Sequence, residues 1–229
     1  MNETRLIILE LERELRNYLL QNKKKVQYDI LLESTAFDLL KEAVFFEKEI
    51  SQNVLKLQDG TTSFFVDFAE RFKNYERLCK KIIDKMQTNH ETLDEAANDI
   101  GDVLRYTLIV NDNEYLSKIK ECLTLLRNDG YRILKFKNTW NSDVYKSINV
   151  IFITDIGFKF EIQFHTPHSY AIKEGKLRYA YEVVRDPNAP EEIVNKANKV
   201  RKYYQSTVEV PYGASEYKYE NEKQLQKMM

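Results

Sequence analysis

The 229-residue chain is poor in the residues that build disulfide and metal sites: it has two cysteines, three histidines, six glycines and four prolines. Two lone cysteines, Cys79 and Cys122, make neither a disulfide framework nor a zinc site, so we expect both to be reduced and packed inside helices. No His-Asp pair and no HExxH motif occurs, which excludes a hydrolase built on histidine metal ligands.

Several functional motifs are missing as well. The chain has no GxxxxGK and no GxGxxG loop, so any phosphate must be bound by side chains. It has no GxSxG, which leaves a nucleophilic triad unsupported. No apolar run approaches the roughly 20 residues that span a bilayer, and the charged N-terminus is unlike a signal peptide. We expect a cytoplasmic protein without a membrane partner; an effector exported without a signal peptide would have the same features.

The composition is that of an ordered globular protein. Hydrophobic residues make up 43% of the chain, and 35 basic residues nearly balance 36 acidic ones. This length can bury a sizeable core. A net charge of −1 does not exclude a local basic pocket.

The first 60 or so residues have the spacing of helices. Apolar residues recur at helical intervals over residues 3–20 and 30–57, and Asp59-Gly60 is a turn signal. Thr62 or Ser63 could cap a third helix. We therefore predict an N-terminal helical segment over residues 1–60.

The hydrophobic period changes near residue 100. Strands are predicted at 103–110, 131–137, 144–154 and 159–166, and helices at 111–130, 169–185 and 191–205. The order β-α-β-β-β-α, flanked by helices at both ends, predicts an α+β fold with one mixed sheet. We expect one domain over residues 61–205 and a polar tail over 206–229 that is loose after Pro211.

The stretch EIQFHTPHS places three polar side chains on one face of a strand: Glu161, Gln163 and His165. Pro167 ends this strand, and Ser169 could cap the next helix. Asp102 stands just before the first predicted strand. Two carboxylates that converge from neighbouring strands suit a Mg²⁺ ion held between protein and nucleotide phosphates. The alternative is that Glu161 faces solvent and pairs with a lysine.

Two other stretches have a chemical character. RFKNYERLCKK, residues 71–81, gathers lysines and arginines that could grip a triphosphate, although a charge run is also typical of a solvated helix face. The polar loop 137–147 contains the single tryptophan and Tyr145. An aromatic side chain there could stack on a base or pack at the sheet edge.

Four of these stretches, DVLRYTLIV, GYRILKFKNTW, YKSINVIF and FEIQFHT, together with the upstream RFKNYERLCKK, resemble the RelA/SpoT-type (p)ppGpp synthetase domain in order and spacing. The resemblance covers residues 71 to about 185 and implies a nucleotidyltransferase-like fold. It also implies an ATP:GTP 3′-diphosphotransferase-like enzyme, which moves pyrophosphate from ATP to the 3′ hydroxyl of GDP or GTP with Mg²⁺. The hydrolase half of long family members has no counterpart here.

The resemblance also implies roles for single residues. Asp102 would hold magnesium, and Glu161 would help hold it and activate the acceptor hydroxyl, with Gln163 beside it on the same face. The side chains that would bind ATP and its phosphates are Arg71, Lys73, Arg77, Lys81 and Arg105. Those that would bind the acceptor are Tyr145, Lys137, Asn149 and His165.

The chain departs from the family pattern at several positions. Arg77 replaces a serine, Asn149 a histidine and His165 an arginine. The first-strand acid and arginine are closer together than in better-known members, so Asp99 rivals Asp102 for the metal. The variant FEIQFHTPxSxxxK with a later YExxR resembles a divergent branch of phage-associated, toxin-like and effector-like members.

These departures leave the acceptor open. An adenine nucleotide or the 3′ end of a tRNA is the alternative to GDP and GTP. A nucleotide-binding module without activity is a third reading, and by analogy with stand-alone synthetases the protein could be a homo-oligomer.

Overall fold

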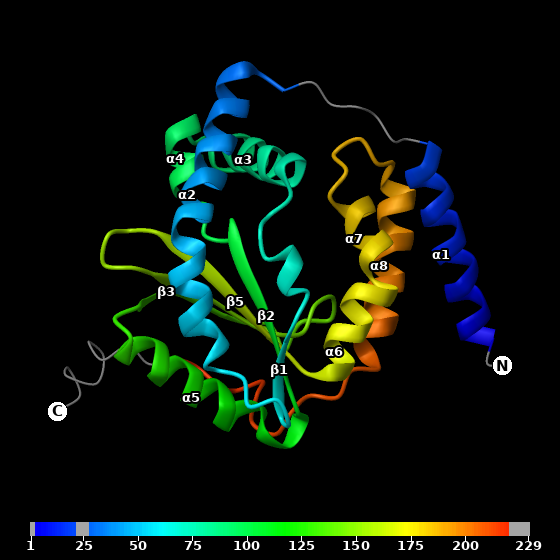
Figure 1. Cartoon of the computed structure of the whole chain (residues 1–229). Coiled ribbons are helices and arrows are strands. Elements are labelled where there is room, and N and C mark those ends of the chain that lie inside the picture. The colour runs from blue at the N-terminus through cyan, green and yellow to red at the C-terminus, as the bar shows by residue number, and fades with distance from the viewer. Residues whose placement is uncertain (1–2, 22–27, 220–229) are drawn as a thin grey trace.

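The computed structural model describes residues 3–21 and 28–219, which form a five-stranded sheet surrounded by helices (Figure 1). The helices are α1 Glu3–Gln21, α2 Ile30–Leu55, α3 Tyr75–Asn89, α4 Leu93–Asn98, α5 Tyr115–Asn128, α6 Pro167–Ala171, α7 Arg178–Val184 and α8 Glu191–Ser206. Three short helical turns are η1 Phe68–Glu70, η2 Asp112–Glu114 and the π-helical η3 Ile172–Lys176. The strands are β1 Ser63–Val66, β2 Leu104–Val110, β3 Arg132–Asn138, β4 Ile148–Ile153 and β5 Lys159–His165.

The sheet has the strand order β1-β2-β5-β4-β3. Only β2 and β5 run parallel, and the other neighbours are antiparallel. The predicted β-α-β-β-β-α order is found as β2-α5-β3-β4-β5-α6. The α+β fold with a mixed sheet is therefore confirmed.

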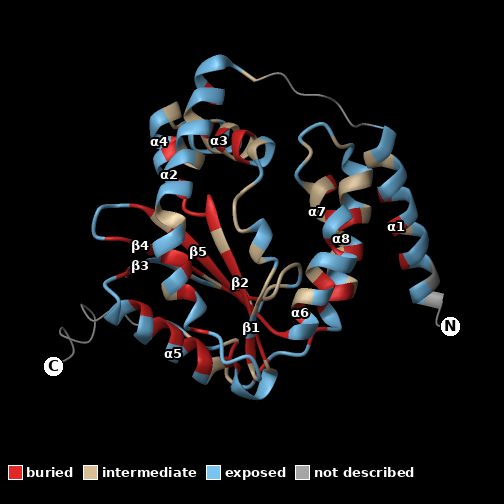
Figure 2. Ribbon diagram, viewed as in Figure 1, coloured by how far each residue is buried: buried red, intermediate tan, exposed pale blue. Residues whose placement is uncertain are grey.

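The two faces of the sheet differ in character. Along β4, Ile148, Val150 and Phe152 are buried while the residues that alternate with them are partly exposed. On the buried face the Phe152 and Phe160 rings stack 5.3 Å apart, and the Tyr106 hydroxyl lies 2.8 Å from Ser51 of α2. Helices α2 and α5 lie on this side (Figure 1), and Figure 2 shows the buried strands beneath them. The polar side chains of β5 point to the opposite face, because strand residues alternate.

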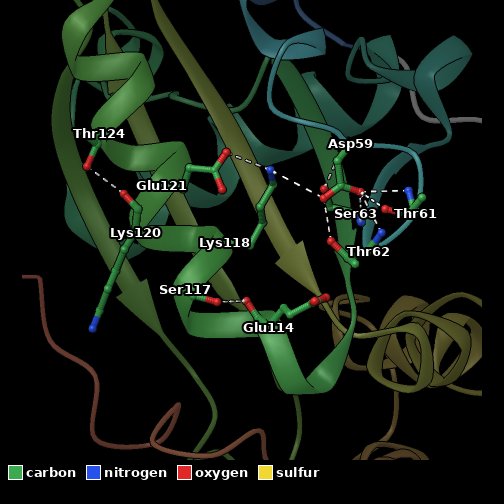
Figure 3. Close-up of polar contacts among 10 residues, drawn as sticks. All are labelled: Asp59, Thr61, Thr62, Ser63, Glu114, Ser117, Lys118, Lys120, Glu121 and Thr124. Atoms are coloured by element: carbon green, nitrogen blue, oxygen red, sulfur yellow. Dashed lines mark hydrogen bonds and ion pairs between the residues drawn. The ribbon is translucent and has the colours of Figure 1, made fainter.

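The predicted third helix beginning at Thr62 or Ser63 is wrong. Residues 63–66 form β1, antiparallel to β2, and the next α-helix begins after Asn74, whose side chain accepts the Arg77 N–H. The reason is a turn in which the Asp59 carboxylate accepts the backbone N–H groups of Thr61, Thr62 and Ser63 (Figure 3). These residues close a turn into a strand instead of capping a helix.

The same turn is tied to α5. Lys118 is buried, with its ammonium 3.0 Å from the Glu121 carboxylate and 3.8 Å from that of Asp59 (Figure 3). A buried ammonium needs such partners, since an unpaired charge is costly to bury. The ion pair therefore fixes the start of β1 against α5.

The segment after β5 is not the continuous helix predicted over residues 169–185. It divides into α6, the π-helical η3 and α7. The residue that caps α6 is Thr166, which accepts the Ser169 N–H while the Ser169 hydroxyl accepts the Thr166 N–H. Ser169 is thus the third residue of a capping box and not the cap itself.

The remaining helices and the tail complete the fold. Helix α1 packs on α7 and α8, whereas α2 packs on α3 and α4. The predicted loose tail is wrong for its described part, because Asn138 of β3 donates to the carbonyls of Ala214 and Tyr217. Residues 220–229 of that tail lie outside the described residues. Cys79 and Cys122 are free and buried, as predicted. Among the described helices, none has the length and apolarity to cross a membrane.

Candidate functional site

Two buried carboxylates lie at the polar face of the sheet. Asp102 precedes β2 and Glu161 lies in β5, each with 8% of its surface exposed. The parallel register of β2 and β5 sets Arg105 beside Glu161. Burial raises the pKa of Glu161, and the negative charge of Asp102 raises it further. The structure thus brings together the two acids proposed from sequence, and it surrounds them with positive charge.

Asp102 is held by two lysines. The Lys73 ammonium lies 2.7 Å from Oδ2 and the Lys81 ammonium 2.8 Å from Oδ1. Burial alone would raise the pKa of Asp102, but the two ammonium groups outweigh it and lower the pKa strongly. The backbone N–H of Lys73 donates to the Val103 carbonyl, which holds the segment before α3 against β2. Because its pKa is lowered, Asp102 is ionised at neutral pH.

Asp99, the rival for the metal role, lies in a different setting. Its side chain is 64% exposed and is paired with Lys85. The hydrogen bond from Lys85 lowers the pKa of Asp99. Asp102 is the aspartate whose charge acts on Glu161, so the geometry favours Asp102 over Asp99.

Gln163 joins Glu161 to a lysine that the sequence reasoning did not include among the site residues. The Gln163 Nε2 donates to Glu161 Oε2 at 2.8 Å, and the Lys173 ammonium donates to Gln163 Oε1 at 3.1 Å. Burial lowers the pKa of Lys173. Its only sequence signal was its place in the motif FEIQFHTPxSxxxK.

Positive charge exceeds negative charge around the two acids. Lys73, Lys81 and Arg105 act electrostatically on Asp102 or Glu161, and Lys173 interacts electrostatically with Glu161. Four cationic side chains thus lie around three carboxylates, those of Asp102, Glu161 and Glu174, the last of which is paired with Lys173. A partly buried excess of positive charge attracts polyanions such as a nucleoside triphosphate.

The other two predicted phosphate-binding residues, Arg71 and Arg77, are paired with carboxylates other than Asp102 and Glu161. Arg71 is paired with Glu47 of α2 at 2.7 Å, and its guanidinium lies over the rings of Phe68 and Phe72 at 4.9 and 5.1 Å. Arg77 is exposed and paired with Glu182 of α7. The basic segment is therefore not one solvated helix face, since its side chains take three directions.

Among the residues predicted to bind the acceptor, Tyr145 contacts a buried histidine. Its hydroxyl lies 3.1 Å from Nε2 of His165, whose Nδ1 lies 2.9 Å from the Ser169 hydroxyl. Burial keeps the pKa of His165 well below its usual value, so the ring is neutral. His165 is fully buried. The predicted role of His165 in acceptor binding would therefore act through Tyr145.

The other acceptor candidates lie along β3 and β4. Asn149 accepts a hydrogen bond from the Ser147 hydroxyl at 2.6 Å, and the Tyr145 hydroxyl donates to it at 3.4 Å. Lys137 is exposed on the edge strand β3, where it pairs with Asn149 in the sheet register. Trp140 is buried and donates to the Tyr115 hydroxyl, so it packs in the core.

Magnesium is the ion that the family resemblance implies. In the described part of the chain, no group of three or more His, Cys, Asp or Glu side chains is placed to hold a metal. Two carboxylates nevertheless suffice for Mg²⁺, which keeps several waters and takes further oxygens from substrate phosphates. Asp102 and Glu161 fit this role, because a cation between them would relieve the repulsion that raises the pKa of Glu161.

Comparisons with known proteins gave matches among solved structures alone. No protein-family model and no curated protein sequence matches the chain. The Type VI effector Tas1, solved with its immunity protein, matches with a TM-score of 0.44 and 19% identity over 79% of this chain and 98% of that one. Small alarmone synthetase 1 from Bacillus subtilis matches with a TM-score of 0.45 and 16% identity, over 73% of this chain and 87% of that one. Small alarmone synthetase 2 from the same organism has the same TM-score of 0.45 and identity of 16%, over 73% and 90%. The chain is similar in structure to these proteins.

Proposed function

We propose that the protein is a Mg²⁺-dependent pyrophosphokinase that transfers pyrophosphate from ATP to the 3′ hydroxyl of a guanine nucleotide, GDP or GTP. The observation that supports this most is the buried pair of Asp102 and Glu161, which interact with four cationic side chains. Transfer of phosphoryl groups depends on positioning and charge neutralisation, and this arrangement offers both.

The proposed step gives each group a chemical task. The acceptor 3′ oxygen forms a bond to the β-phosphorus of ATP, the bond from that phosphorus to the α–β bridging oxygen breaks, and AMP leaves. Glu161 accepts the hydroxyl proton. Gln163 donates to Oε2 of Glu161, which leaves the other carboxylate oxygen to take the proton. Lys73, Lys81 and Arg105 would neutralise the charge that develops on the phosphate oxygens.

Magnesium would be held by Asp102 and Glu161 and would supply further neutralisation of the phosphates. Tyr145 would offer its ring to the acceptor base, since aromatic side chains stack on bases of every kind. Tyr145 is partly exposed, and its ring lies edge-on to that of Tyr181 at 6.2 Å.

The test is incubation of the purified protein with labelled ATP, Mg²⁺ and single acceptors: GDP, GTP, AMP, ADP, ATP or tRNA. We expect AMP and a pyrophosphorylated guanine nucleotide, with the rate reduced at least about 100-fold by Glu161→Gln, the lower range for loss of a catalytic base. Asp99→Asn, which changes an exposed acid three residues before Asp102, is the matched control and should leave the rate unchanged.

Other outcomes separate the alternatives. Product formed only from an adenine nucleotide or tRNA would support the proposed transfer reaction and show that the acceptor is not a guanine nucleotide. Nucleotide binding by calorimetry without AMP formation would favour a binding module. A Glu161→Gln variant with the wild-type rate would contradict the proposed chemistry.

A further inference from the structure

Lys173 lies in an unusual stretch of helix that places its ammonium group close to Glu161, the proposed base. It lies in η3, where the Leu177 N–H donates to the Ile172 carbonyl five residues earlier at 3.0 Å. Such π-helical turns are rare and occur often at functional sites. The Lys173 side chain is 17% exposed, and its ammonium lies 3.1 Å from the Glu174 carboxylate.

The contacts of Lys173 decide how the Gln163 amide is oriented. An ammonium group can only donate hydrogen bonds, and an ionised carboxylate can only accept them. Gln163 lies between the two, with Oε1 at 3.1 Å from Lys173 and Nε2 at 2.8 Å from Glu161 Oε2. The reversed amide would set NH₂ against NH₃⁺ and oxygen against oxygen. Only one orientation therefore satisfies both neighbours.

We propose that Lys173 is a positioning residue that acts on Glu161 through Gln163. The inference rests on the proposed function, since it concerns the residue assigned there as the base. By fixing the amide, Lys173 directs an N–H group to Oε2 of Glu161 and holds the carboxylate in one rotamer. Oε1 is then the oxygen that receives the acceptor proton.

A direct role is the competing explanation, because a lysine at this face could also contact a phosphate of ATP. The two roles differ in their dependence on Gln163. A positioning lysine loses its effect once the glutamine side chain is removed, whereas a lysine that binds phosphate does not. A double-mutant cycle separates them.

The experiment measures kcat and KM for wild type, Lys173→Met, Gln163→Leu and the double variant. We expect Lys173→Met to lower kcat about 10- to 100-fold, the range for loss of a hydrogen bond to a charged group, with little change in the KM for ATP. In the Gln163→Leu background the same substitution should have no further effect. Lys173→Arg should recover part of the loss, because it restores a donor. Lys176→Met, at an exposed lysine of the same π-helical turn, is the matched control.

Urea unfolding shows whether each variant is folded, and Lys173→Gln replaces Lys173→Met if the latter is not. Fold-reductions in kcat that multiply in the double variant, or a rise in KM alone, would overturn the positioning role while the proposed function stands. A wild-type protein that forms no AMP with any acceptor would overturn the proposed function, and the positioning role with it.

Discussion

Replacement of Glu161 by glutamine should stabilise the folded chain while it removes the proposed activity. Burial and the nearby charge of Asp102 raise the pKa of Glu161, so its ionised form is less favourable in the folded chain than in the unfolded one. Glutamine has nearly the same shape and no charge. Its amide oxygen can still accept the hydrogen bond from Gln163, which lies at 2.8 Å from Oε2 in the wild type.

The sign of the pH dependence follows from proton linkage. A carboxyl group with a raised folded-state pKa binds more protons in the folded state, so the free energy of unfolding falls as pH rises. The fall begins near the ordinary glutamate pKa of about 4.3 and continues through the raised value. The glutamine variant lacks this term. Its advantage over wild type should therefore grow with pH and be largest at neutral pH.

The size of the effect is limited by the attraction of Glu161 to Arg105 and Lys81, which opposes the rise in pKa. We expect a gain of about 1 kcal/mol, within the range for relief of a destabilised functional residue. For a chain of this length that gain raises the Tm by about 2–4 °C. The assay is urea unfolding in EDTA between pH 4 and pH 8, beside the turnover assay.

Glu42→Gln, at an exposed position of α2, is the control and should change the free energy of unfolding by no more than about 0.5 kcal/mol. A Glu161→Gln variant less stable than wild type at pH 7 would refute the reasoning. So would a stability difference that narrows as pH rises, since the raised pKa would then not be the cause.

Three further predictions concern single side chains. Asp102→Asn should lower the free energy of unfolding by about 3 kcal/mol, because it leaves two ammonium groups without their partner. The exposed Asp99→Asn should change this free energy little, and equal losses for the two variants in urea unfolding would contradict the prediction. Since the pKa of Asp102 is lowered, its stabilising contribution should be lost as pH falls below about 4, and Asp102→Asn should lack that acid-dependent loss. Glu47→Gln should release Arg71 and raise the KM for ATP about tenfold at unchanged kcat; an unchanged KM in steady-state kinetics would show that this ion pair does not position the arginine. Asp59→Ala should lower the Tm by about 2–4 °C through loss of a cap-like interaction of about 1 kcal/mol, with turnover unchanged; an unchanged Tm would show that the turn closes without the carboxylate.

The sequence predicted best where the local pattern has a clear period. The alternation of Glu161, Gln163 and His165 identified both the strand and its polar face, and the structure has β5 over residues 159–165. The proximity of Asp102 to this face could not come from such a pattern. It depends on the parallel pairing of β2 with β5, two strands far apart in the sequence. The order of motifs in the family resemblance supplied that link.

The errors arose where one residue type serves two purposes. Ser and Thr cap helices but also close turns, so Thr62 or Ser63 was expected to cap a third helix. Ser63 instead begins a strand of four residues, which is too short to show a period. Lys173 was overlooked for a similar reason. A lysine within an amphipathic helix is usually solvated. Lys173 contacts Gln163 from a π-helical turn, and the sequence pattern does not predict such a turn.

The side chains of the basic segment, residues 71–81 before and within α3, are ordered by ion pairs before any ligand binds. Its cations are held by carboxylates from different elements: Arg71 by Glu47 and Arg77 by Glu182, while Lys73 is held by the site aspartate. Side chains ordered in this way lose less rotamer freedom when they bind phosphate, so less of the binding energy is spent on ordering them. A nucleotide that engages Arg71 or Arg77 must, however, compete with these carboxylates. Arg77 and Glu182 are both about half exposed, and an exposed pair is worth no more than about 1 kcal/mol. The pair that joins α3 to α7 is therefore the one that a phosphate can displace most easily.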